Sequence, residues 1–250
     1  MNNQQIAAFW NEFAPDYVAA QNESRLVITT DLTAYLCQQQ ILPHAQVLDV
    51  GGGAGRFALP FAHVAQQVII NDISRRMLAY AQQKIKAAKL TNVTVNLGAW
   101  QQLALKPRAQ VVFASMLPLE PAAVAAFSRL ATKYAVLNRA VVHHDSLTAE
   151  IQKLLTITPE YDPTDDAAIF TAYQQVVRQL GFQPWQKQFT YQLTEAVTPE
   201  MLRAEWLDQL NWRQQLRFNQ WLQQKFAGRT QIVAKQRYVF KTLLWRLDSR

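Results

Sequence analysis

Short apolar runs alternate with amphipathic stretches along the first 140 residues. The apolar runs are rich in Val, Ile and Leu with little alternation, which is typical of strands covered on both faces. The predicted strands are 45–50, 67–72, 92–97, 109–115 and 133–138. Helical periodicity is found between them at 55–64, 74–89 and 120–131. This alternation predicts an α/β fold with a doubly wound, mostly parallel sheet.

Beyond residue 140 the pattern changes. Residues 145–157 and 165–181 have helical periodicity, residues 182–193 are predicted as a strand, and residues 231–245 as the final strand of a seven-stranded sheet. Between these two strands, residues 198–228 predict a helical insertion that caps the sheet. Its start is marked by Thr198 followed by Pro199, since Thr caps helices and Pro suits the first helical position.

Composition narrows the class of protein. Half of the 250 residues are apolar, enough for one sizeable domain. The single cysteine, Cys37, excludes an internal disulfide, a multi-thiolate zinc site and an iron–sulfur cluster. We expect no metal site, because the chain has only four histidines. We expect no membrane partner and a cytoplasmic protein, because no leader pattern and no apolar run near the roughly 18 residues of a membrane span is found.

The net charge of +7 is concentrated near the C-terminus. Residues 201–250 carry 10 Lys or Arg against 3 Asp or Glu, whereas residues 1–200 carry 15 of each. Aromatic, apolar and basic types are mixed there, as on a nucleic-acid surface, at Trp206, Leu210, Arg213, Arg217, Phe218 and Trp221. Helical spacing suited to packing a cap on the sheet is found at Trp206, Leu207, Leu210, Leu216 and Trp221, and this interpretation is favoured.

The glycine-rich segment after the first predicted strand carries the clearest chemistry. A turn of this kind lets a ligand approach the backbone and the N-terminus of the following helix. A dinucleotide site needs G-x-G-x-x-G, and Arg56 stands where its third small residue would be. The pattern present is acid-x-G-x-G-x-G, matched by Asp49, Gly51, Gly53 and Gly55. A carboxylate there suits a ligand with an ammonium group better than a pyrophosphate.

With this motif the chain resembles the class I S-adenosylmethionine-dependent methyltransferases, and the motif-level resemblance covers about residues 9–140. The resemblance implies S-adenosylmethionine as cofactor and S-adenosylhomocysteine as product. Asp49 would balance the cofactor's amino group, and Asp72, at the end of the second strand, would accept the ribose hydroxyls. Ile73 would form an apolar wall for the adenine.

The resemblance also assigns cofactor contacts to the ends of the third and fourth strands. After the third strand, Ala99 stands where the family usually has an acid, and Trp100 could stack on the adenine instead. After the fourth strand, Ser115 and Met116 would border the sulfonium. Gln110 is a second departure, since the family often has an acid at that strand start.

The segment before the first strand resembles the leading helix of many small-molecule methyltransferases, which folds over the cofactor. Phe13 and Tyr17 are four residues apart and share a helix face, and Tyr17 is predicted to contact the cofactor. We therefore expect a single domain over residues 1–250. Its parts are an N-terminal lid at 1–40, a cofactor-binding core at 41–140 and a substrate-side half at 141–250.

Candidate catalytic residues follow the fifth predicted strand. His143 and His144, with Asp145 beside them, could provide a general base and its orienting group. Because adjacent residues on an extended chain point to opposite sides, at most one histidine would face the cleft. The alternative is a solvated or capping histidine.

The sequence therefore predicts methyl transfer from S-adenosylmethionine to a small molecule whose identity it does not reveal. Three alternatives stay open. They are an RNA methyltransferase that uses the basic C-terminal region, a catalytically silent S-adenosylmethionine-binding protein, and a nicotinamide-dependent oxidoreductase, which is the least favoured.

Overall fold

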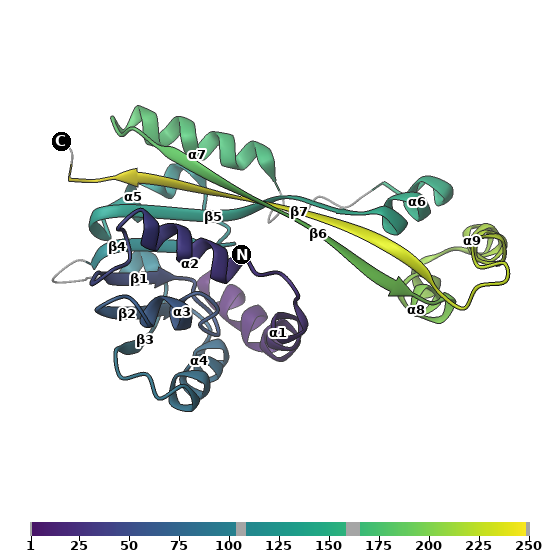
Figure 1. The fold of residues 1–250 in the computed structure, drawn as a ribbon, viewed down its shortest axis with the longest axis horizontal. Helices are drawn as coiled ribbons and strands as arrows, with labels where there is room; N and C mark the ends of the chain where they lie inside the picture. The colour runs from purple at the N-terminus through teal and green to yellow at the C-terminus, as the bar shows by residue number, and fades with distance from the viewer. Residues whose placement is uncertain (1, 104–108, 159–165, 249–250) are drawn as a thin grey trace. The chain divides into compact units, whose positions relative to one another are not determined.

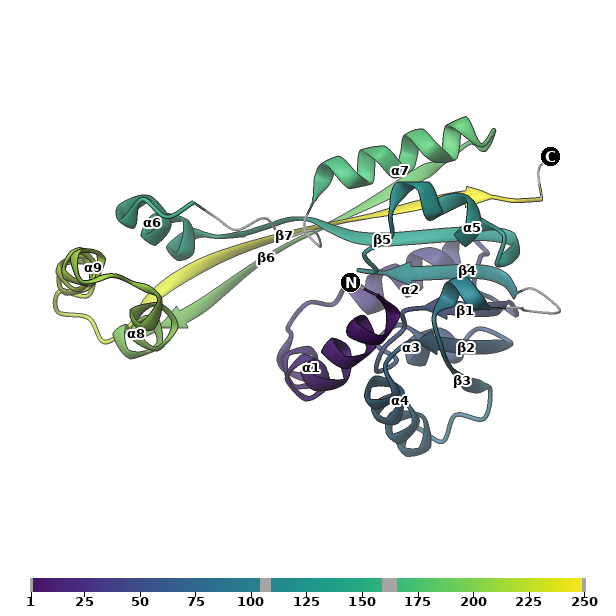
Figure 2. The ribbon, with the colours of Figure 1, turned by 180° about the vertical axis from the view of Figure 1, so that it is seen from behind.

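The computed structural model describes residues 2–103, 109–158 and 166–248 (Figures 1 and 2). The chain divides into two compact units. The first unit comprises Met1–Arg139, Ala167–Phe189 and Lys241–Arg250, and the second comprises Ala140–Asp166 and Thr190–Phe240. The prediction that the chain is a single domain stays a prediction.

Seven strands form one sheet in the order β3-β2-β1-β4-β5-β7-β6. The strands are β1 (Gln46–Val50), β2 (Gln67–Asp72), β3 (Val93–Leu97), β4 (Ala109–Ser115), β5 (Ala131–Asp145), β6 (Trp185–Val197) and β7 (Ile232–Arg246). Neighbouring strands from β3 to β5 pair in parallel, and the arrows of β6 and β7 point in opposite directions (Figure 1). The predicted doubly wound, mostly parallel sheet is confirmed.

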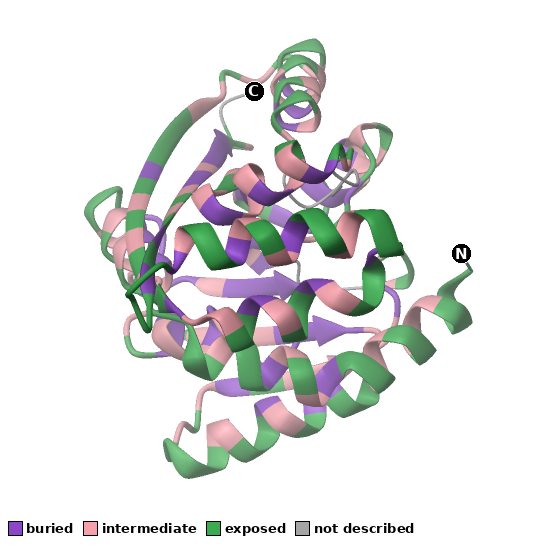
Figure 3. Ribbon diagram, turned by 90° about the vertical axis from the view of Figure 1, so that its right-hand side faces the viewer, coloured by how far each residue is buried: buried purple, intermediate pink, exposed green. Residues whose placement is uncertain are grey.

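The strand order reverses between β1 and β4, and in sheets of this kind ligands bind at the carboxyl ends of the two strands beside such a point, so the ligand crevice is expected there. Both strands lie near the centre of the sheet and are mostly buried, and Figure 3 shows purple, buried strands behind the helices. Phe113 of β4 packs against Phe57 and Phe61, with ring centroids 5.1 and 4.9 Å away. This cluster fixes the segment that follows the glycine turn.

Helices cover the sheet of the first unit. They are α1 (Asn3–Glu23), α2 (Ile28–Gln38), α3 (Ala58–Ala62), α4 (Arg75–Ala87), α5 (Val124–Ser128) and α7 (Ala167–Gln179), with short 3-10 turns η1 (Trp100–Gln102) and η2 (Pro121–Ala123). The helix α4 starts as predicted, because the Ser74 hydroxyl accepts a hydrogen bond from the Met77 N–H at 3.1 Å. The helix α3 is shorter than predicted, since the glycine turn extends further along the chain.

The second unit holds α6 (Ser146–Leu155), α8 (Pro199–Trp206), η3 (Leu207–Gln209) and α9 (Trp212–Lys225), together with parts of β5, β6 and β7. Trp206 and Leu210 are buried in its core and Leu207 and Trp221 pack against it, which confirms the packing interpretation for these residues. The packing interpretation is wrong for Leu216, because this residue is 56% exposed. Trp212 is 70% exposed.

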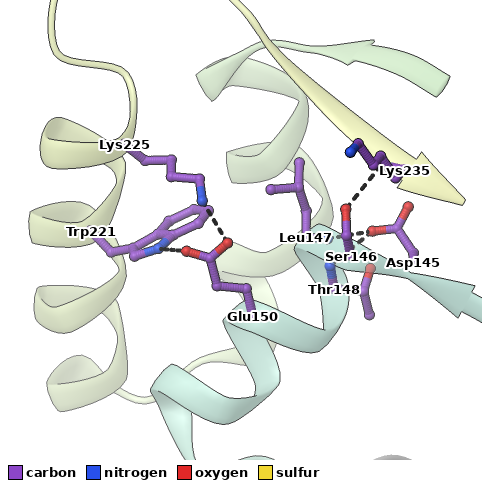
Figure 4. A network of polar contacts seen from close by, with 8 residues as sticks. All are labelled: Asp145, Ser146, Leu147, Thr148, Glu150, Trp221, Lys225 and Lys235. Atoms are coloured by element: carbon purple, nitrogen blue, oxygen red, sulfur yellow. Dashed lines mark hydrogen bonds and ion pairs between the residues drawn. The ribbon is translucent and has the colours of Figure 1, made fainter.

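Polar contacts join the helices of the second unit (Figure 4). The Glu150 carboxylate of α6 accepts hydrogen bonds from Trp221 Nε1 at 2.9 Å and from Lys225 Nζ at 2.6 Å, both on α9. At the start of α6, Asp145 Oδ1 accepts from the N–H groups of Leu147 and Thr148. Asp145, which the sequence suggested as a partner of a catalytic histidine, therefore caps a helix.

None of the helices in the described residues has the length and apolar character that crossing a membrane requires. Within the same residues, no three His, Cys, Asp or Glu side chains are grouped so that they could hold a metal ion.

Candidate cofactor site

The glycine turn follows β1 in a backbone conformation that requires glycine. Gly51, Gly53 and Gly55 have φ angles of +65°, +52° and +78°, which L side chains adopt only with strain. The Gly52 N–H donates to the Asn71 carbonyl of β2 at 3.1 Å, and the Gly55 N–H donates to the Gly52 carbonyl at 2.9 Å. The turn is thus fixed to the neighbouring strand.

Space around the turn differs from one glycine to the next. A Cβ atom at Gly51 would lie 2.8 Å from Leu117 Cδ1, and one at Gly55 would lie 2.4 Å from Leu59 Cδ1. At Gly53 the nearest atoms would be Met77 Sδ at 3.8 Å and Asp72 Oδ2 at 3.9 Å. The protein therefore leaves room beside Gly53, where a ligand can approach the backbone.

Asp49 lies beneath this turn and is 2% exposed. Its Oδ2 atom has no hydrogen-bond partner among the described residues. Burial, and then the charge of Asp72, raise the pKa of Asp49 from 3.8 to about 8, although a hydrogen bond from the Ala58 backbone opposes the shift. A buried carboxyl group without a cation is suited to a positively charged ligand.

Asp72, at the end of β2, connects the glycine turn to α4. Its Oδ2 accepts from the Gly53 N–H at 2.9 Å and its Oδ1 accepts from the Ser74 N–H at 2.7 Å. Burial raises the pKa of Asp72 while these backbone hydrogen bonds lower it. Each carboxylate oxygen can still accept another hydrogen bond, so the predicted contact with ribose stays open. Ile73 is half-buried beside it.

Tyr17 of α1 lies close to the glycine turn. It is partly buried and packs against a cluster that includes Ala54 and Met77. Burial raises the pKa of Tyr17, the Arg56 guanidinium lowers it, and the charges of Asp72 and Asp49 raise it. The N-terminal helix thus brings a phenol to the predicted cofactor site.

The end of β4 has a strained backbone. Met116 has φ +59°, and its N–H donates to the Asn138 carbonyl of β5 at 2.9 Å. The Asn138 side chain donates to Ser115 Oγ at 2.9 Å and accepts from Thr242 Oγ1 at 2.8 Å. A non-glycine residue at positive φ beside a ligand crevice is typical of a functional site.

The comparison with protein families agrees with this geometry. A family model described as a methyltransferase domain matches residues 47–138, from β1 to β5. Together with the sheet order and the glycine turn, this match decides the family of the core. Residues 47–138 form a class I methyltransferase domain. This family uses S-adenosylmethionine as its methyl donor.

Solved structures share the fold of the whole chain. Magnesium protoporphyrin IX methyltransferase from Synechocystis PCC 6803, with bound S-adenosylhomocysteine, has a TM-score of 0.60 and 14% identity over 97% of this chain and 99% of that one. The [4+2]-cyclase SpnF has a TM-score of 0.60 and 16% identity, over 98% of this chain and 96% of the cyclase chain. Precorrin-6y C5,15-methyltransferase from Geobacter metallireducens GS-15 has a TM-score of 0.54 and 13% identity, over 89% of this chain and 92% of the precorrin methyltransferase chain. A comparison with curated protein sequences gave no match.

The two departures from the family pattern in the methyltransferase domain have different surroundings. Gln110 Oε1 accepts a hydrogen bond from the Gln46 N–H at 2.9 Å, so it joins the first residues of β4 and β1. Ala99 is 8% exposed, at the start of η1. The adjacent Trp100 is half-buried, with its ring edge-on to Phe127 at 6.3 Å. Its predicted contact with adenine stays a prediction.

Trp100→Ala is expected to weaken binding of S-adenosylhomocysteine to the methyltransferase domain about fivefold to 150-fold, because base stacking on an aromatic ring contributes roughly 1–3 kcal/mol. Isothermal titration calorimetry would measure this loss. Trp185→Ala, at the start of β6, is the matched control. Equal affinities of Trp100→Ala and the wild type would exclude adenine stacking on Trp100.

His143 and His144 lie in the second unit, outside the matched methyltransferase domain. The fifth strand continues to Asp145, so the predicted end of this strand at residue 138 is wrong. Buried Ala140 and Val141 continue the strand pattern before it becomes polar. Both histidines are exposed, and the His143 ring stacks on Tyr238 at 4.4 Å. Their catalytic role stays a prediction.

Sequence reasoning missed two asparagines that shape the methyltransferase site. Asn71 Nδ2 donates to the carbonyls of Asn96 and Gly98, at 3.2 and 3.0 Å, and so holds the turn after β3. Asn11 Oδ1 of α1 accepts from Ser74 Oγ at 2.8 Å and from the Arg76 N–H at 3.0 Å. For Asn71 the sequence offered one signal, a polar residue at the end of an otherwise apolar predicted strand. For Asn11 the sequence offered no signal.

Proposed function

We propose that this protein transfers the methyl group of S-adenosylmethionine to a small-molecule acceptor. Asp49 carries the proposal, because a buried carboxyl group beneath a glycine turn favours a ligand with an ammonium group and disfavours the phosphates of a dinucleotide. Asp49, Asp72, Tyr17 and the glycine turn would hold the cofactor. When bound, S-adenosylmethionine supplies an activated methyl group that an acceptor lone pair can attack in line.

The residues after β4 support alignment more than proton transfer. In the segment Ser115–Leu119 the one side chain with a polar group is Ser115, and its hydroxyl already accepts from Asn138. The protein would therefore act by placing the acceptor and excluding water. An acceptor that carries a proton would need a base from elsewhere, and His143 and His144 are the candidates.

Two of the fold relatives are named for small-molecule acceptors, magnesium protoporphyrin IX and precorrin-6y, so this fold accommodates such acceptors. Identities of 14% and 13% show the fold alone, so neither compound is transferred to this chain. SpnF, with the same fold, is a cyclase. Methyl transfer therefore requires a direct test.

Calorimetry with S-adenosylhomocysteine and with NAD tests the cofactor. We expect S-adenosylhomocysteine to bind with one site per chain and NAD to give no signal. NAD binding would instead support an oxidoreductase. Activity would then be measured as enzyme-dependent formation of S-adenosylhomocysteine from S-adenosylmethionine and a small-metabolite extract. Binding without turnover across such extracts would favour the catalytically silent protein.

A second candidate, RNA methylation, is favoured by one observation. Trp212 is 70% exposed, and the Arg213 guanidinium lies 5.1 Å from the centre of its ring. Such a pair can stack on a base and contact phosphate. If RNA is the acceptor, its affinity should fall steeply between 50 and 200 mM salt, by roughly 10³-fold for six phosphate contacts, and Trp212→Ala should weaken it. No RNA binding at low salt would remove this candidate.

A further inference from the structure

Arg139, at the end of the first unit, is a buried cation that bonds to the segment after β4. Its residue exposure is 2%, and its Nη1 donates to the Leu117 carbonyl at 2.8 Å and to the Tyr173 hydroxyl at 3.3 Å. The guanidinium carbon also lies 5.8 Å from the centre of the Tyr173 ring. Tyr173 of α7 is fully buried, and its hydroxyl donates to the Leu119 carbonyl.

Both side chains therefore hold carbonyl groups of one short turn. The Leu119 N–H donates to the Leu117 carbonyl at 2.8 Å, which closes a three-residue turn around Pro118. Directly before it, Met116 has φ +59°. Such a strained residue persists only where its surroundings fix it, and here Arg139 and Tyr173 fix the following residues.

The turn that they hold touches the glycine turn. Leu117 Cδ1 is 2.8 Å from the position that a Cβ of Gly51 would take, so these two turns are in direct contact. They follow β4 and β1, the strands on either side of the ligand crevice. Leu117 therefore packs directly against the glycine turn at Gly51.

A buried cation is a costly way to fill space. An apolar side chain of similar volume is often as stabilising as a buried charged group, or more so. Packing alone gives no reason for an arginine at position 139, whereas fixing a carbonyl group requires a donor.

We propose that Arg139 and Tyr173 are positioning residues that hold the Met116–Leu119 turn against the glycine turn, and thereby set where the methyl donor meets its acceptor. The proposal rests on the proposed function, because it places the cofactor at the glycine turn. Neither residue is assigned a contact with the reacting atoms.

Tyr173→Phe is the sharpest test, since it removes one hydroxyl and keeps the ring. We expect the dissociation constant of S-adenosylhomocysteine to rise about threefold to tenfold, as for the loss of one hydrogen bond, and the melting temperature to fall as well, because the buried Leu119 carbonyl loses its donor. Arg139→Met should weaken binding by about tenfold or more, and Arg139→Lys should restore part of it. Tyr134→Phe, on the same strand β5, is the matched control.

A second measurement needs no ligand. The ¹³C-methyl signal of Met116, assigned by its loss in Met116→Leu, should shift in Tyr173→Phe and stay in place in Tyr134→Phe. A lower melting temperature with unchanged affinity and an unchanged Met116 signal would reduce both residues to a structural role and overturn the proposal. If the wild type does not bind S-adenosylhomocysteine, the proposed function fails, while the Met116 signal still decides whether the turn is held as described.

Discussion

Gly53→Ala is expected to fold like the wild type and to bind S-adenosylhomocysteine at least about 100-fold more weakly, a loss of about 2.7 kcal/mol. A Cβ at this position meets no protein atom closer than 3.8 Å, so the packing accepts it. The φ angle of +52° should lower the free energy of unfolding by about 1–2 kcal/mol. The added methyl group lies beside Asp72 Oδ2, where the ribose is predicted to bind. Calorimetry and urea unfolding measure the two effects separately.

Gly55→Ala provides the contrasting control. Its Cβ would lie 2.4 Å from Leu59 Cδ1 and 3.4 Å from Ile70 Cδ1, and its φ angle is +78°. We expect a loss of about 2–4 kcal/mol of stability, because strain and overpacking add. If Gly53→Ala binds the ligand normally while Gly55→Ala is destabilised, the open side of the turn is not the cofactor site.

Asp49→Asn is expected to weaken ligand binding about tenfold to 100-fold and, at the same time, to stabilise the protein at alkaline pH. The unfolded Asp49 loses its proton near pH 3.8, whereas the folded one keeps it up to about pH 8. Unfolding therefore releases a proton between these values, and stability falls as pH rises through this window, by at most about 1.4 kcal/mol per pH unit. The amide side chain of the Asp49→Asn variant carries no charge and lacks this dependence.

Melting temperatures at pH 6 and pH 8.5 test the stability effect. The wild type should lose several degrees more than Asp49→Asn over this interval, and Asp16→Asn, which changes an exposed carboxylate on α1, should follow the wild type. Parallel melting curves for the wild type and Asp49→Asn would contradict the raised pKa of Asp49.

The same carboxyl group links ligand binding to protons. A bound ammonium group favours the ionised form of Asp49, so binding at pH 7 should release up to one proton in the wild type and less in Asp49→Asn. Calorimetry in two buffers with different ionisation enthalpies measures the number of protons released. Equal release by both proteins would place the ammonium group away from Asp49.

The sequence allowed the sheet and the glycine turn to be predicted because both depend on local patterns. Apolar runs mark β1 to β4, and the Ser74 cap and the glycine spacing are short-range signals. The extension of β5 to Asp145 was not predicted, because the last residues of this strand are polar and exposed and lack the apolar pattern of a buried strand.

The supports of the site could not be predicted in the same way. Asn11 bonds to residues 63 and 65 positions away, and Asn138 reaches Thr242 at a separation of 104. Arg139 and Leu117 are 22 residues apart and share no periodicity. Such contacts exist only once the chain has folded, so a single sequence contains no local signal for them.

Asn11 ties the N-terminal helix to the first turn of α4, next to the residue that anchors Asp72. Lifting α1 away to admit a ligand would leave the Arg76 N–H and the Ser74 hydroxyl to be satisfied by water. Since Ser74 also donates its N–H to Asp72, we expect undocking of α1 to perturb the predicted ribose contact. A molecule with α1 undocked is therefore expected to release its cofactor faster.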